Sequence, residues 1–286
     1  MNRSILELRV LRQKGRYLVI KYGSWRGLYD PNYPQLLKLL KSSKPLRRRA
    51  TRLFKHSPNL LVEVSLGSGL RVVVKDFGWR NFLHFWASPF VKSKALRSLE
   101  IATHLLKNGL LTPRPIGAFE QRNEGLIEKA YFITESLGET DNVREFLQLC
   151  PEGGKERRRI LTILAEYVRQ MHDCGLLHRD LTLANFLIKD EEVYLIDLTR
   201  ARVKTRLPVF QKIEDIAKME LAPADHFLLF NLYWGKQKGR RFWYRLLCLR
   251  VALYQADRRL KRLRRRVRRF FQQGYHLGMK ERNNRI

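Results

Sequence analysis

From Arg49 to Phe77, hydrophobic and polar residues alternate along the chain in the manner typical of strands. The segment LLVEVSL, a turn at Gly67 to Gly69 and the segment LRVVVKDF predict a β-hairpin whose second strand ends near Lys75. Residues 1–45 carry turn signals, including Gly23 and Gly27, but their mixed pattern favours no single element.

Helical periodicity follows. Residues 93–107 predict a helix, with Ser93 as its N-cap and Gly109 just past its end. The segment TPRPIG breaks that helix, and residues 131–137 (YFITESL) predict another strand. A second amphipathic helix is predicted over residues 156–173, ending at Gly175.

Two short strands, NFLI and EEVYLIDL, are predicted next, joined by a turn at Lys189 and Asp190, and the chain from about residue 212 is predicted to be helical. This order predicts an α+β fold with two lobes. Residues 1–137 are predicted to form the small N-lobe, with a sheet and one long helix. Residues 138–286 form a mostly helical C-lobe.

Composition bears on partners more than on fold. Lys and Arg number 57 against 27 for Asp and Glu, giving a formal net charge of +30, so a polyanion is an expected partner. The three cysteines lack the paired spacings of a zinc site or disulfide framework, which favours reduced thiols. The N-terminal segment lacks the features of a secretory signal, and no stretch approaches the roughly 20 apolar residues of a membrane span. These features predict a cytoplasmic protein whose membrane association is peripheral.

The strongest chemical signal is HRDLTLANFLI followed by VYLIDLTR. Phosphoryl transfer requires an acceptor hydroxyl held in line and metal to neutralise the phosphate charge. In this arrangement Asp180 orients the hydroxyl and accepts its proton, while Asn185 and Asp197 supply hard oxygen ligands to Mg²⁺. The joint spacing, more than any one residue, predicts a kinase-like site for ATP and Mg²⁺.

Residues upstream agree with this interpretation. Lys75 ends a VVVK strand, where a kinase lysine holds the α- and β-phosphates, and Glu100 lies 25 residues later on a helix, where it is predicted to pair with Lys75. No glycine-rich loop precedes the hairpin. The segment 42–49 occupies the expected position, and the hydroxyls of Ser42 or Ser43 are candidates for contacting the phosphates.

These motifs resemble the bacterial lipopolysaccharide-core kinase family over roughly residues 38–234. The resemblance rests on VVVKDF, RSLEIATHLLKNGLLTPRPIGAFE, HRDLTLANFLI and IDLTRAR. It implies a protein-kinase-like two-lobed fold that phosphorylates heptose or Kdo of the lipopolysaccharide inner core at the cytoplasmic side of the inner membrane. The implied partners are the core and lipid A glycolipid and the anionic inner-membrane surface.

Departures from protein kinases favour a small hydroxylated acceptor. Thr182 stands where Ser/Thr kinases carry a lysine, DFG becomes Asp197-Leu198-Thr199, and only about ninety residues follow Asp197. Asp215 is a candidate for the helix carboxylate that supports the catalytic loop, with a surface charge as the equal alternative.

Two basic regions remain. Aromatic and cationic residues alternate over residues 78–94, which suits either a membrane interface or an insertion packed on the small lobe. Nine of the twelve residues 258–269 are basic on a helix with a narrow apolar stripe. Because no nucleic-acid fold signature accompanies it, this helix favours anionic lipid over RNA or DNA. For the whole chain, the alternatives to a lipopolysaccharide-core kinase are an atypical protein kinase and a basic nucleic-acid-binding or scaffold protein with a kinase-like fold.

Overall fold

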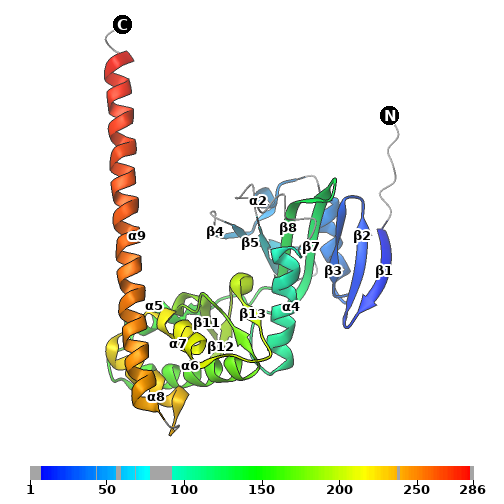
Figure 1. Ribbon diagram of the computed structural model, residues 1–286. Coiled ribbons are helices and arrows are strands. Elements are labelled where there is room, and N and C mark those ends of the chain that lie inside the picture. The colour runs from blue at the N-terminus through cyan, green and yellow to red at the C-terminus, as the bar shows by residue number, and fades with distance from the viewer. Residues whose placement is uncertain are drawn as a thin grey trace, which may run out of the picture.

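The computed structural model describes residues 8–42, 44–55, 59–67, 69–77, 92–236 and 239–283, with side chains described as far as Arg264. An eight-stranded antiparallel sheet forms the N-lobe, in the order β1-β2-β3-β7-β8-β6-β5-β4 (Figure 1). Its strands are Leu8–Lys14 (β1), Tyr17–Tyr22 (β2), Trp25–Tyr29 (β3), Arg52–Lys55 (β4), Leu60–Ser65 (β5), Arg71–Asp76 (β6), Pro115–Asn123 (β7) and Leu126–Glu135 (β8).

The predicted hairpin is confirmed as β5 and β6, which pair with Leu61 opposite Lys75. Val72 and Val74 are fully buried on one face of β6. Three short helices cover that face: η1 (Pro34–Leu36), α1 (Leu37–Lys41) and α2 (Leu46–Arg49). Because side chains alternate along a strand, Lys75 lies on the opposite face, the one that also carries Phe77 and packs against α4.

Within the first 45 residues, whose sequence pattern favours no single element, residues 8–29 form β1, β2 and β3 and extend the sheet through pairing of β3 with β7. Val10 and Leu11 of β1 are exposed, so the apolar residues of this strand do not mark a face that packs into the core. Gly27 makes the junction possible, because a Cβ there would lie 2.2 Å from the carbonyl oxygen of Ala118. The close approach of β3 to β7 therefore requires glycine.

The predicted helix after residue 93 is confirmed as α4 (Lys94–Lys107), and the Ser93 hydroxyl accepts a hydrogen bond from the Leu96 amide at 3.2 Å. Leu99 packs into the small-lobe core below the sheet. Ile101 and Leu105 pack into the core of the helical lobe. Helix α4 therefore belongs to both cores and fixes one lobe against the other.

The second lobe is mainly helical and contains two small sheets, β10-β13 and β12-β11-β9. The predicted long helix is α6, and NFLI and the following strand are β11 and β12. Its elements are β9 (Asp141–Asn142), α5 (Val143–Leu149), α6 (Lys155–Asp173), β10 (Leu176–Leu177), η3 (Leu183–Asn185), β11 (Phe186–Lys189), β12 (Glu192–Leu195), η4 (Leu198–Arg200), β13 (Arg202–Val203), α7 (Val209–Ile216), η5 (Ala217–Met219), α8 (Pro223–Trp234) and α9 (Arg240–Asn283).

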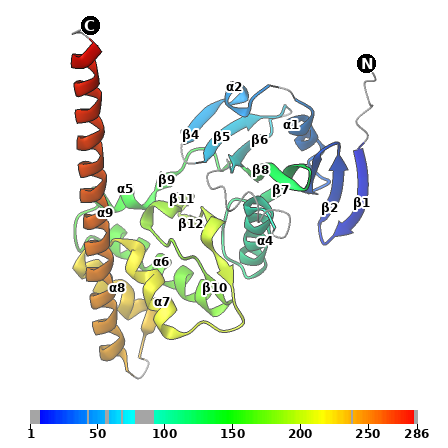
Figure 2. The ribbon, with the colours of Figure 1, turned by 45° about the horizontal axis from the view of Figure 1, so that its top comes forward.

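Helix α9 begins against α7 and α8, and its C-terminal half projects beyond the lobe in both views (Figures 1 and 2). Leu249, Leu253, Leu260 and Leu263 are each more than half exposed. Among the helices of the described residues, none is long and apolar enough to cross a bilayer.

Candidate active site

Residues 178–185, between β10 and β11, form the loop that we call the catalytic loop. Hydrogen bonds within the loop fix its shape. The amide of Thr182 donates to the carbonyl oxygen of Asp180 at 2.9 Å, and the amide of Asn185 donates to Thr182 at 2.9 Å. The side-chain amide of Asn185 also donates to the Asp180 carbonyl at 2.8 Å. Asp180 and Asn185 are thus brought together, and the side-chain oxygen of Asn185 is left available as a metal ligand.

Asp215, on α7, holds this loop from behind. Its carboxylate is 1% exposed and accepts hydrogen bonds from the backbone amides of His178 and Arg179, each at 2.7 Å. Burial alone would raise the pKa of Asp215, but the imidazoles of His172 and His178 and the His178 amide together hold it below its ordinary value. The interpretation of Asp215 as a supporting carboxylate is therefore confirmed, and the surface-charge alternative is wrong.

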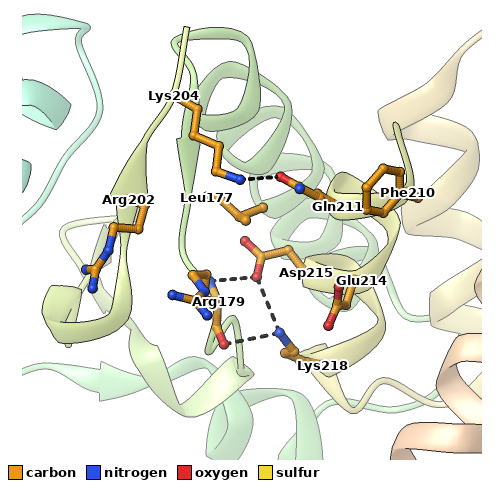
Figure 3. Close-up of a pocket in the computed structure, with 9 residues that line it drawn as sticks. All are labelled: Leu177, Arg179, Arg202, Lys204, Phe210, Gln211, Glu214, Asp215 and Lys218. Atoms are coloured by element: carbon orange, nitrogen blue, oxygen red, sulfur yellow. Dashed lines mark hydrogen bonds and ion pairs between the residues drawn. The ribbon is translucent and has the colours of Figure 1, made fainter. Parts of the chain in front are cut away.

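A cavity of about 350 Å³ lies on this supporting side of the loop (Figure 3). In it, Lys218 donates to the Arg179 carbonyl at 3.1 Å and lies 3.9 Å from Asp215. Lys204 donates to Gln211 at 3.0 Å. The lining residues are Leu177, Arg179, Arg202, Lys204, Phe210, Gln211, Glu214, Asp215 and Lys218, so the cavity adjoins the loop's support rather than Asp180.

The hairpin β11–β12 carries Asp197 to the same place. The Ile196 amide donates to the Asn185 carbonyl at 2.8 Å, and a His178 ring nitrogen lies 3.2 Å from the Ile196 carbonyl oxygen. Asp197 itself adopts a left-handed conformation, with φ of 57°. Such a conformation is uncommon for a residue other than glycine, and it turns the carboxylate out of the strand.

Lys75 reaches across from the N-lobe to this carboxylate. Its ammonium group lies 2.5 Å from Asp197 and donates to the Thr199 hydroxyl at 3.0 Å, while that hydroxyl donates to Asp197 at 2.9 Å. Burial alone would raise the pKa of Asp197, but Lys75 and Thr199 hold it below its ordinary value. Asp197 is therefore anionic at neutral pH. A carboxylate and the amide oxygen of Asn185 are donors that could hold Mg²⁺, which binds few protein ligands together with phosphates and water.

The predicted ion pair between Lys75 and Glu100 is wrong for this structure. Glu100 pairs with Lys92 at 2.8 Å and with Lys14 at 3.3 Å, whereas Lys75 pairs with Asp197. Both partners of Glu100 are more than half exposed, and the acidic group of Asp197 is the one within reach of Lys75. The nucleotide-binding role of Glu100 stays a prediction.

The two serines proposed for phosphate contact are not placed equally. Ser42 ends α1, and its hydroxyl accepts a hydrogen bond from the Lys44 amide at 3.3 Å. Ser43 lies outside the described residues, as do residues 56–58 between β4 and β5 and most of the aromatic segment 78–94. The role of either serine stays a prediction.

Sequence reasoning missed two residues that the structure adds. Thr199 bridges Lys75 and Asp197, and Arg200 lies 3.5 Å from the Asp180 carboxylate. Both follow directly in the segment IDLTR, so adjacency to Asp197 was the available signal.

The part of the chain that contains this site is similar to a known protein family. The model of the lipopolysaccharide kinase (Kdo/WaaP) family matches residues 62–243, which is more than half of the chain and includes Lys75, Asp180 and Asp197. The chain belongs to this family. Kinases of this family are phosphotransferases, which agrees with the chemistry of the convergent side chains.

Individual relatives are distant. The 3-deoxy-D-manno-octulosonic acid (Kdo) kinase of Vibrio cholerae is 31% identical over 121 residues, covering 42% of this chain and 49% of the relative. The lipopolysaccharide core heptose(I) kinase WaaP of Escherichia coli K12 is 25% identical over 184 residues, covering 58% of this chain and 69% of that protein. The chain thus spans about half the length of the first relative and just over two thirds of the second.

The solved structure of WaaP in complex with acyl carrier protein aligns with a TM-score of 0.55 and 17% identity, covering 77% of this chain and 94% of that one. At this identity the match bears on the fold alone. The expected kinase-like architecture, with an antiparallel sheet in the small lobe and a helical second lobe, is confirmed.

Proposed function

We propose that this chain is an ATP-dependent kinase that uses Mg²⁺ to phosphorylate a hydroxyl of a lipopolysaccharide inner-core sugar, heptose or Kdo. The observation that carries the proposal is the convergence of Lys75, Asp180, Asn185 and Asp197 from three separate segments of a chain in the lipopolysaccharide kinase family. In phosphoryl transfer, such positioning and charge neutralisation supply most of the catalysis.

Each residue has a distinct role in this mechanism. Asp180 orients the sugar hydroxyl and accepts its proton as the oxygen attacks the γ-phosphate. Lys75 contacts the α- and β-phosphates, which requires it to exchange its contact with Asp197 for one with the nucleotide. Asn185 and Asp197 would hold Mg²⁺, whose charge offsets that of the phosphates.

The choice of a sugar acceptor rests on the site and on the names of the relatives. Thr182 replaces the lysine expected in Ser/Thr protein kinases, and Leu198-Thr199 replaces Phe-Gly after Asp197. The relatives named above are Kdo and heptose kinases. The acceptor would then be presented at the cytoplasmic face of the inner membrane, with the protein bound there peripherally.

The direct test is transfer from labelled ATP to delipidated core oligosaccharide by the purified chain. We expect Asp197→Asn and Asn185→Ala each to raise the Mg²⁺ concentration needed for half-maximal rate, because each loses one oxygen ligand. Unshifted Mg²⁺ titrations for both variants would contradict the metal assignment. Mass spectrometry of lipopolysaccharide from a deletion strain, with loss of one core phosphate, identifies the acceptor.

Membrane attachment is proposed for the projecting half of α9. A variant is made with Gln in place of Arg264, Arg265, Arg266, Arg268 and Arg269. We expect it to be released from anionic vesicles without slower transfer to a soluble acceptor, because basic residues near an anionic surface each contribute about 1 kcal/mol to binding. Salt is expected to act in the same way. Retained vesicle binding with lost RNA or DNA binding would assign the helix to nucleic acid instead.

A further inference from the structure

Arginines from three separate elements lie beside the loop that carries Asp180. Helix α5 packs against η3 of that loop, and α9 packs against η5, whose Lys218 donates to the Arg179 carbonyl of the loop. Arg144 lies on α5, Arg200 on η4 and Arg258 on α9, and we call these three residues the arginine collar. The sequence pattern of the basic C-terminal helix favours a role in binding anionic lipid. In the structure α9 also packs against η5, where Arg258 pairs with the carboxylate of Glu220, the residue that follows η5.

The arginines of the collar contact two carboxylates, Asp180 and Glu220. Arg200 lies 3.5 Å from the Asp180 carboxylate. Arg144 lies 3.3 Å from Glu220, and Arg258 is ion-paired with the other oxygen of Glu220. Glu220 follows η5 and adopts a left-handed conformation, with φ of 58°, beneath both arginines. The three arginine side chains are 37% to 67% exposed, so a ligand can reach them.

The positive charge is crowded. Burial lowers the pKa of Arg258, and the charges of Arg262 and Arg144 lower it further. Burial raises the pKa of Tyr254, and Asp180 adds to that rise while Arg144 and Arg200 oppose it. These effects agree with the packing of α5 and α9 beside the loop and with the Arg200–Asp180 contact, which place the collar next to the catalytic carboxylate. The three arginines face the carboxylates of Asp180 and Glu220, and Arg262 adds a fourth cation. Asp257, a further carboxylate near Tyr254, is already paired with Lys261 at 2.5 Å, so a bound anion would relieve the repulsion among the arginines.

We propose that the arginine collar binds an anionic group on the acceptor, a carboxylate or a phosphate, beside the hydroxyl that Asp180 activates. Guanidinium groups suit both anions because their planar donors form paired, charge-assisted hydrogen bonds. The proposal rests on the proposed kinase function and narrows its acceptor to an acidic or already phosphorylated sugar. Neutral sugars would lack the group that fixes the hydroxyl against Asp180.

The test compares Arg144→Gln and Arg258→Gln with Arg259→Gln, a matched control that removes an exposed arginine from the neighbouring position of α9. We expect both collar variants to raise KM for core oligosaccharide about 10- to 100-fold, the range of a lost hydrogen bond to a charged group. We expect KM for ATP to stay unchanged in both collar variants. We expect Arg259→Gln to keep the wild-type KM for core oligosaccharide. Arg258→Lys, which keeps the charge, is expected to recover part of the affinity.

Two modified acceptors distinguish the anions. With carboxyl groups reduced to alcohols, the difference between wild type and collar variants disappears if the ligand is a carboxylate. With phosphates removed, it disappears if the ligand is a phosphate. An equal loss on an acceptor stripped of both, or the same loss in Arg259→Gln, would overturn the proposal.

Calorimetric binding of the core oligosaccharide requires no turnover and separates the two proposals. If wild type binds the acceptor through the collar but transfers no phosphate, the kinase function fails and the anion site stands. If wild type transfers phosphate while the collar variants bind and react normally, the anion site fails and the kinase function stands.

Discussion

The two sides of the active site are held in place by very different means. On the helical lobe, Asp215 is buried and fixes two consecutive amides of the catalytic loop. On the N-lobe, Glu100 contacts the half-exposed side chains of Lys14 and Lys92, and Lys75 is paired with a prospective metal ligand.

Buried, charge-assisted hydrogen bonds are costly to break, whereas exposed ion pairs contribute little. The loop that carries Asp180 and Asn185 is therefore fixed by the fold itself. Under the proposed function, Lys75 must exchange its contact with Asp197 for one with the nucleotide. The following predictions test this contrast, beginning with the largest expected effect.

The catalytic carboxylate comes first. We expect Asp180→Ala to lower phosphoryl transfer by about 10²- to 10⁴-fold, the usual contribution of a general base, with nucleotide affinity nearly unchanged. Single-turnover transfer and nucleotide titration measure the two quantities. Asp173→Ala, at the exposed end of α6, is the matched control. Full activity in the Asp180 variant would remove the catalytic assignment.

Loss of the supporting carboxylate comes next. We expect Asp215→Asn to cost about 3 kcal/mol of unfolding free energy, because a neutral amide cannot accept from both loop amides and a buried charge network is broken. kcat falls while ATP affinity is retained, and hydrogen exchange at the amides of His178 and Arg179 accelerates. Glu214→Gln changes an exposed neighbour on the same helix and is the control. Unchanged hydrogen exchange at these two amides in the Asp215 variant would show that the loop keeps its conformation without the Asp215 carboxylate.

The helical lobe also predicts acid sensitivity. Burial lowers the pKa of His226 to about 4, against an ordinary value of 6.5, with Asp225 opposing. The folded state therefore disfavours the charged ring, so the stability present above pH 6.5 is lost as pH falls toward 4, by about 2 kcal/mol at pH 5.

We expect His226→Leu to reduce the difference in melting temperature between pH 7.5 and pH 5. His172 and His178, whose pKa values are also lowered by burial, keep part of the slope. An unchanged pH dependence in the variant would mean that His226 is solvated when protonated.

The smallest effects are expected on the N-lobe. Glu100→Gln is predicted to change unfolding free energy by less than about 1 kcal/mol, because its partners are exposed. It is nevertheless expected to raise KM for ATP several-fold if Glu100 moves to Lys75 when the nucleotide binds. Lys92→Gln breaks the observed pair and serves as the control. Equal KM values for ATP in wild type and Glu100→Gln would show that Glu100 has no role in nucleotide binding. The ion pairs of the N-lobe would then contribute even less to the site than those of the helical lobe.

Several elements were predictable because their signals are local. The hairpin carrying Lys75 follows from alternation around a glycine turn, and α4 follows from its cap and apolar spacing. Strands β1 to β3 were not predictable, because part of β1 is exposed and because β3 pairs with β7, about ninety residues away. The predicted boundary between the lobes at residues 137 and 138 stays a proposal, since α4 packs into both cores.

The sequence by itself determined the kinase-like chemistry, because Asp180, Asn185 and Asp197 lie on one short stretch of chain whose spacing is set by a loop and a hairpin. Only the tertiary structure decided which charges meet. Lys75 pairs with Asp197 and not with Glu100, Asp215 binds the loop amides from α7, and Arg258 of α9 pairs with Glu220. Such pairings depend on distances across packed elements, and Coulomb energies fall with distance and exposure in ways that no local pattern records.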